Sequence, residues 1–167
     1  KRFLFLILIV SFNVSAAEQA ITQWVYNTLE RAQANLDKGN VEAAERIYYD
    51  YSNDTWSSRS YDHFVILRTY AYFLLSFDRN EEALRYLKQA SLKRDMPPYD
   101  IFELNFTLGQ VYYVTGDREN AKKTLLKWVE IGEKNKLDLK PEGYAILATI
   151  YAQDEEWGNA LKFITLA

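Results

Sequence analysis

The chain has 167 residues, of which 49% are apolar and 26% charged, a composition typical of a folded globular protein with a sizeable core. A net charge of −3 and the lack of a contiguous basic patch argue against a nucleic-acid-binding surface. Without cysteine, the chain has no disulfide, no thiolate nucleophile and no cysteine ligand for a metal.

The first 17 residues carry the three zones of an export signal in order. Lys1 and Arg2 form a basic start, residues 3–10 (FLFLILIV) are all apolar, and residues 14–17 (VSAA) supply small side chains for cleavage. The apolar run is shorter than the ~20 residues that a membrane-spanning helix needs. We therefore predict a signal peptide at residues 1–17, a periplasmic mature protein, and no membrane span after cleavage. A membrane anchor or a buried first helix is the alternative interpretation.

The remaining residues, 18–167, repeat at a nearly constant period. Four similar phrases centre on alanines separated by 39, 38 and 39 residues: Ala44, Ala83, Ala121 and Ala160. A small residue precedes each alanine by twelve positions: Ala32, Ala71, Gly109 and Ala148. Self-similarity at a period of a few tens of residues predicts a stack of helical repeats, each with a helix A, a short turn and a helix B. The fold expected from this pattern is an all-α solenoid.

With each alanine taken as position 20, the repeats begin near Val25, Phe64, Phe102 and Pro141, and the upstream small residue is position 8. Small residues at 8 and 20, with larger ones at 11 and 24, define the tetratricopeptide repeat (TPR), and residues 20–167 resemble that family. The third repeat is the clearest, with Gly109, Tyr112, Gly116 and Ala121 in place. Small residues there let two helices approach to ~8–10 Å.

Two features depart from the family pattern. The period exceeds the usual ~34 residues, and we expect the excess between each helix B and the next helix A. The fourth repeat also stops at Ala167, before its helix B is complete, so we expect the array to continue in a longer protein.

The start of each helix B carries its own signals. The predicted N-cap residues, whose side chains can accept from unpaired backbone N–H groups, are Asn40, Asn80 and Asp117. Acid–base pairs four residues apart are expected on the solvated helix surface: Glu42/Arg46, Glu81/Arg85 and Glu119/Lys123.

The sequence predicts no catalytic, cofactor-binding or metal site, and therefore no enzyme. His63, the only histidine, is expected just before the second helix A, in a surface or capping role, because no reactive partner for it is identifiable. No nucleophile elbow, phosphate-binding glycine loop or metal-ligand spacing is present.

The TPR resemblance implies that helix A lines a concave groove through positions 2, 5, 9 and 12, where a protein or extended peptide binds. The candidate residues, at these positions or directly next to them, are Tyr26, Gln33, Arg68, Tyr72, Glu103, Phe106, Gln110, Tyr113, Thr149 and Gln153. Tyrosine and arginine dominate binding hot spots. Each tyrosine is equally compatible with core packing.

Residues 102–136, with the two prolines before them and the Ala160 phrase, are similar to periplasmic TPR proteins that accompany TonB–ExbB–ExbD systems. This resemblance implies an interaction scaffold that assists TonB-dependent uptake, with TonB–ExbB–ExbD components as partners. Two other functions remain open. One is an accessory factor for envelope assembly or cell-wall synthesis enzymes, and the other is the regulatory repeat segment of a larger enzyme.

Overall fold

The computed structural model describes residues 20–53 and 60–167, and every regular element in these ranges is a helix. The predicted all-α solenoid is thus confirmed, whereas the predicted signal peptide lies outside the described residues. The helices are α1 (Gln23–Asp37), α2 (Val41–Asn53), α3 (Ser60–Leu75), α4 (Asn80–Ser91), α5 (Pro98–Val114), α6 (Arg118–Asn135), α7 (Pro141–Gln153) and α8 (Trp157–Ile164). None of these described helices combines the length and the apolar character needed to cross a bilayer.

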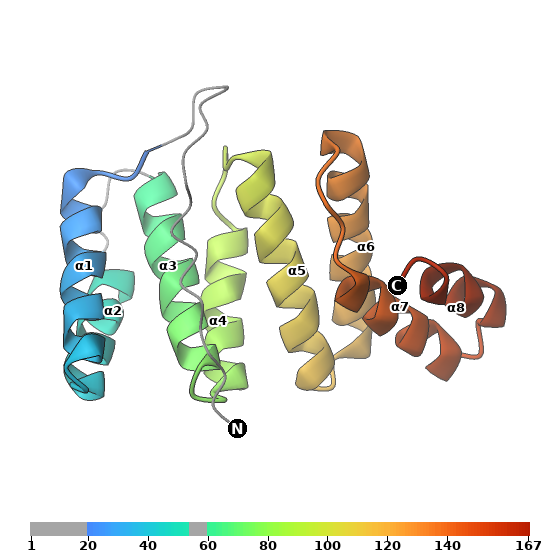
Figure 1. Ribbon diagram of the computed structural model, residues 1–167, viewed down its shortest axis with the longest axis horizontal. Coiled ribbons are helices and arrows are strands. Elements are labelled where there is room, and N and C mark those ends of the chain that lie inside the picture. The colour runs from blue at the N-terminus through green and yellow to red at the C-terminus, as the bar shows by residue number, and fades with distance from the viewer. Residues whose placement is uncertain (1–19, 54–59) are drawn as a thin grey trace.

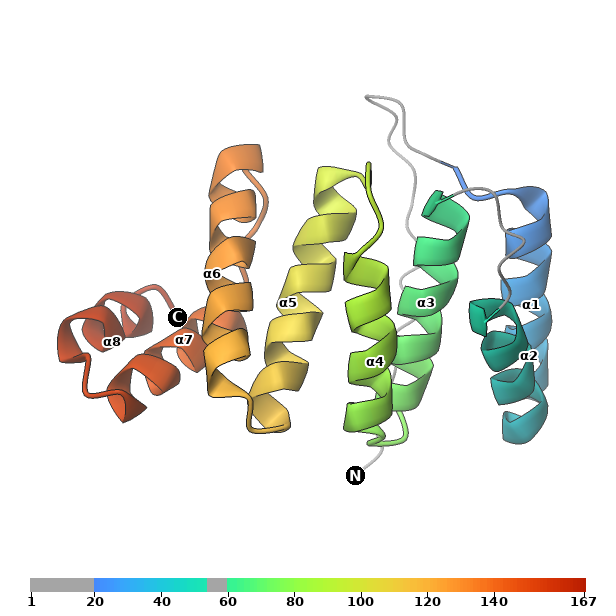
Figure 2. The same ribbon diagram turned by 180° about the vertical axis from the view of Figure 1, so that it is seen from behind.

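The helices form four antiparallel pairs, and the first three pairs stand side by side. Helices α1, α3 and α5 lie in one layer and α2, α4 and α6 in the other, as the opposite views of Figures 1 and 2 show. The first layer corresponds to helix A of each repeat and the second to helix B. The extra repeat length was expected in the connections between helix B and the next helix A. Part of it lies instead within α6, which is 18 residues long.

Small side chains hold the two helices of each pair together. The residues at positions 8 and 20 are all buried: Ala32, Ala71, Gly109 and Ala148, with Ala44, Ala83, Ala121 and Ala160. At Gly109, an added Cβ atom would lie 2.6 Å from Cγ of Leu125, which is fully buried on α6. A side chain at position 109 would therefore force Leu125 to shift, and glycine permits the close spacing of α5 and α6.

The four turns between helix A and helix B share one backbone conformation. The residue at position 15 has a positive φ in every repeat: Gly39 (76°), Asp78 (58°), Gly116 (85°) and Glu155 (61°). In the third repeat, Gly116 N–H donates to the Tyr113 carbonyl at 3.1 Å and Asp117 N–H to the Tyr112 carbonyl at 2.9 Å. This is the hydrogen-bond pattern of a Schellman motif, which ends a helix and reverses the chain.

The residue after this turn precedes helix B and takes the N-cap position. In the third repeat the carboxylate of Asp117 accepts from Asn120 N–H at 3.2 Å, so the predicted cap is confirmed. In the second repeat the cap is Arg79, without a side-chain cap bond, and Asn80 is the first helical residue. The prediction of Asn80 was wrong by one position, because the turn geometry, and not the preference of asparagine for caps, places the start of α4.

The fourth repeat turns away from the direction of the first three. Helices α7 and α8 lie across the axes of α1–α6 in both views of the ribbon (Figures 1 and 2). Helix α7 begins directly over Trp128 of α6, and a Cβ atom on Gly143 would lie 2.4 Å from the indole ring. The connection before α7 packs Leu139 onto Gly132, where an added Cβ would lie 2.6 Å from Leu139. Two close glycine contacts therefore set how α7 crosses α6.

Two apolar clusters fill the solenoid. One extends through α1–α6 and reaches Ile150 of α7, and the other joins α5 and α6 to α7 and α8. Trp128 is the centre of the second cluster, with ring centroids of Phe102, Phe106 and Tyr144 at 5.6, 5.1 and 5.7 Å. It is 0% exposed, and its Nε1 has no hydrogen-bond partner among the described residues.

Candidate functional site

The ten candidate groove residues all lie on the A helices, but they differ in exposure. Tyr26, Thr149 and Gln153 are exposed, and Phe106 is buried. The others are half-buried: Gln33, Arg68, Tyr72, Glu103, Gln110 and Tyr113. These differences follow from what each side chain contacts on the neighbouring helix.

Arg68 is committed to an ion pair between α3 and α5. Its Nη1 lies 2.5 Å from Oδ1 of Asp100, its guanidinium lies over the Phe64 ring at 5.1 Å, and its side chain is 21% exposed. The hydroxyl of Tyr61 donates to the other oxygen of Asp100 at 3.0 Å. Arg68 therefore joins neighbouring repeats, and a ligand could reach only the fifth of the side chain that remains exposed.

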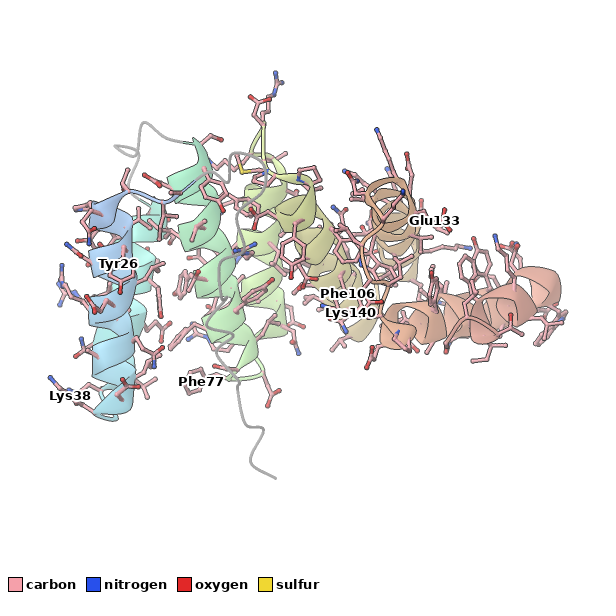
Figure 3. The ribbon with its side chains drawn as sticks, turned by 45° about the horizontal axis from the view of Figure 1, so that its top comes forward. Tyr26, Lys38, Phe77, Phe106, Glu133 and Lys140 are labelled. Carbon is pink, nitrogen blue, oxygen red and sulfur yellow. The ribbon has the colours of Figure 1, made fainter. Side chains whose placement is uncertain are left out.

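Phe106 and Glu103 are covered by the start of α7. The ammonium of Lys140 contacts both carboxylate oxygens of Glu103, at 2.9 and 3.1 Å, and lies 4.5 Å from the centroid of the Phe106 ring. Phe106 packs behind this pair on Trp128. Figure 3 shows Phe106 and Lys140 next to each other where α7 meets α5. The turn of the fourth repeat thus makes Phe106 a core residue.

The two candidates on α7 form hydrogen bonds with their own helix and with α6. Thr149 donates its hydroxyl to the Ala145 carbonyl of its own helix at 2.8 Å. Gln153 accepts from Arg118 at the start of α6, at 3.2 Å, beside the ion pairs of Lys122 with Asp154 and Glu156. A cavity of about 400 Å³ lies here between the turns of the third and fourth repeats, lined by Gly116, Asp117, Arg118, Glu119, Lys122 and Asp154.

The remaining candidates lie along α1, α3 and α5 with their side chains exposed or partly exposed. Tyr26 is 52% exposed on α1, and Figure 3 shows it on the outside of that helix. Tyr72 lies with its hydroxyl 3.4 Å from that of Thr107, which joins α3 to α5. Gln110 and Tyr113 follow on α5, half-buried. We refer to Tyr26, Gln33, Tyr72, Gln110 and Tyr113 as the A-face residues.

A repeated carboxylate contact was missed by the sequence reasoning. Asp62 and Asp100 each lie two residues before the phenylalanine that begins their repeat, and both are buried. Asp62 accepts from the Thr22 backbone N–H at 3.0 Å and the Thr22 hydroxyl at 2.9 Å, as Asp100 does from Tyr61. The signal was present in the sequence, because Tyr-Asp-x-Phe occurs at residues 61–64 and again at 99–102.

His63 lies inside the first turn of α3 and not before it, as was expected. Its Nε2 lies 3.0 Å from the Ser52 carbonyl at the end of α2, and Lys93 Nζ lies 2.9 Å from its Nδ1. Burial lowers the pKa of His63, the Ser52 carbonyl opposes this, and the Lys93 charge lowers it further. A neutral imidazole that donates to Ser52 and accepts from Lys93 satisfies both contacts. The contact with Ser52 agrees with the capping role proposed from the sequence.

The ion pairs also differ from the sequence prediction. Arg46 pairs with Asp50 at 3.8 Å and Arg85 with Glu82 at 3.7 Å, instead of with the glutamates four residues before them. Over residues 20–53 and 60–167, no group of three or more metal-ligating side chains comes together.

Comparisons with known proteins support the fold. No family model matches the chain, and no curated protein matches it. Among solved structures, the chain is similar to the crystal structure of MamA, a TPR-like helical repeat protein, with a TM-score of 0.63 and 17% sequence identity. The match covers 84% of this chain and 74% of the MamA chain. At this identity the likeness establishes the architecture alone.

Proposed function

We propose that the protein is a non-catalytic scaffold that binds an extended segment of a partner protein along its A-helix layer. The observation that carries this proposal is the set of A-face residues. Each keeps part of its side chain exposed, although Tyr72 and Tyr113 also pack against the first apolar cluster. Three tyrosines and two amides combine rigid apolar area with hydrogen-bonding groups, as hot spots of protein interfaces do.

The finer proposal is that this scaffold acts in the periplasm and assists TonB-dependent uptake. Its support is the order of basic, apolar and small residues at 1–17 and the likeness of residues 102–136 to TPR proteins of TonB–ExbB–ExbD systems. If export occurs, N-terminal sequencing of the mature protein reads from Ala17 or Glu18. A mature chain that still begins at Phe3 or earlier contradicts it.

The binding test compares substitutions in the two helix layers. The exposed tyrosine changed in each layer is almost equally exposed. Tyr26 on α1 is 52% exposed and Tyr49 on α2 is 53% exposed. We expect the double variant Tyr26→Ala/Tyr113→Ala to weaken binding by about thirtyfold, since loss of hot-spot contacts costs ~2 kcal/mol or more. Tyr49→Ala should leave affinity unchanged, and circular dichroism should show unchanged helicity in both variants.

Purified TonB, ExbB and ExbD domains are the first ligands to titrate, followed by cell-wall synthesis enzymes. Binding of TonB-system proteins that depends on the A-face residues supports both proposals. Binding of cell-wall factors through the same residues keeps the scaffold and rejects the TonB role. Equal affinity of the double variant and the wild type rejects the A-helix layer as the binding surface.

A further inference from the structure

Neighbouring A helices are joined at their N-terminal ends by the same contact twice. In each contact the donor is a side-chain hydroxyl that lies three residues before the start of a repeat. The acceptor is an aspartate that lies two residues before the start of the following repeat. Thr22 donates to Asp62 at 2.9 Å, and Tyr61 donates to Asp100 at 3.0 Å. We call these contacts rungs. Both aspartates are buried, at 4% and 7% exposure, so each rung closes the junction against solvent.

The third rung has its donor but lacks its acceptor. Tyr99 occupies the position of Thr22 and Tyr61, whereas the residue at the aspartate position of the fourth repeat is Leu139. Leu139 packs onto Gly132 of α6. Tyr99 is 58% exposed, and no hydrogen bond of its hydroxyl is found among the described residues.

The turn of the fourth repeat explains why this end of α5 is left uncovered. Lys140, at the start of α7, meets Glu103 and Phe106, which lie further along α5 than Tyr99 does. Helix α7 therefore joins α5 below its first turn, whereas α3 and α5 meet at their first turns through Asp100. The surface that an aspartate-bearing helix start covers in the earlier repeats is open here.

The electrostatic surroundings of Tyr99 can accept a carboxylate. Arg68 and Lys140 lie near its hydroxyl and are balanced by Asp100 and Glu103, so the four charges cancel. The Lys140 side chain is 40% exposed and can turn toward an added acid. Burial is the largest cause that raises the pKa of Tyr99, and Glu103 adds to it, so the hydroxyl stays protonated and able to donate.

We propose that Tyr99 and Lys140 form a binding site for an acidic side chain of the partner, which takes the place that Asp62 and Asp100 take within the chain. The chain supplies the template for this occupant, since both of its completed rungs end on a carboxylate. The proposal rests on the scaffold function and specifies the chemistry of one end of the bound segment.

The chain also supplies a probe with that chemistry. A peptide of residues 95–106 (DMPPYDIFELNF) presents the aspartate of the completed rung, and the same peptide with Asp100→Asn is its matched control. We expect NMR titration of the labelled protein to show the first peptide binding about tenfold more tightly than the second, a difference of about 1.4 kcal/mol, since only the first offers a charged acceptor for the hydrogen bond. The shifted resonances should be those of Tyr99 and Lys140.

Two protein variants separate the hydroxyl from the general surface. Tyr99→Phe removes only the donor and should abolish the preference for the aspartate peptide, whereas Tyr49→Phe, at a tyrosine of similar exposure on α2, should keep it. Absence of binding, equal binding of the two peptides, or an unchanged preference in Tyr99→Phe overturns the proposed site. If the site fails while Tyr26→Ala/Tyr113→Ala still weakens partner binding, the scaffold function stands. If neither experiment shows an effect, both proposals fail.

Discussion

The first three repeats and the fourth are built from the same repeat pattern, yet they stack differently. In both regions small residues at positions 8 and 20 are buried and the A–B turn holds a left-handed residue. Between repeats, however, α1, α3 and α5 are joined at their N-terminal ends by hydroxyl–aspartate rungs, whereas α7 is placed by Trp128. The pairing of helices within a repeat and the stacking of successive repeats therefore have separate physical causes.

The stacking difference also has a functional consequence. Because α7 crosses lower on α5, it buries Phe106 and leaves Tyr99 exposed. The fourth repeat therefore covers Phe106, a candidate contact of the A-helix layer, and leaves Tyr99 exposed as a different one.

Helix α8 has an exposed apolar face. Its residues Trp157, Leu161 and Ile164 lie on one side of the helix and are each more than half exposed.

The largest expected effect is the loss of the contact that places the fourth repeat. Trp128→Ala should lower the free energy of unfolding by about 3–5 kcal/mol, because it empties the centre of the second apolar cluster. Trp128→Phe should cost much less, since it keeps an aromatic ring and removes a buried N–H without a partner. Urea unfolding measures both. An alanine variant within 1 kcal/mol of the wild type would show that this tryptophan does not hold α7.

A smaller effect is expected within the regular part of the stack. Gly109→Leu should cost about 1–3 kcal/mol, because the new side chain meets Leu125 at the closest approach of α5 and α6. Gln110→Leu, one residue along on the accessible layer, should change stability by about 0.5 kcal/mol or less. Thermal unfolding compares the two variants. Equal melting temperatures would mean that the register assigned to helix A is incorrect.

The smallest effect tests the feature that both regions share. At position 15, Glu155→Gly should stabilise the protein by about 0.5–1 kcal/mol, because glycine adopts a positive φ without steric cost. Gly116→Ala, at the equivalent turn of the third repeat, should destabilise it by a similar amount. Denaturant unfolding measures both changes in stability, as shifts of the midpoint concentration at an unchanged slope of the unfolding free energy. Changes of the same sign in the two variants would contradict the equivalence of the turns.

The helical pairs could be predicted from the amino-acid sequence alone. Small residues recur at two positions of each repeat. Such a pattern predicts a close contact between two helices, because the contact depends on residue size at a fixed spacing along one chain segment. The same holds for Asp117 as a cap, since a cap bonds to a residue only three positions away.

How the repeats stack, and which candidate residues remain exposed, became known only from contacts between residues that are far apart in the sequence. The contacts of Arg68 with Asp100, Glu103 with Lys140, and Gly143 with Trp128 join residues from different repeats. These contacts form only when successive repeats pack at a particular angle. That angle cannot be predicted from the residue spacing within one repeat. For the same reason Phe106, at a groove position in the sequence pattern, lies in the core beneath Lys140.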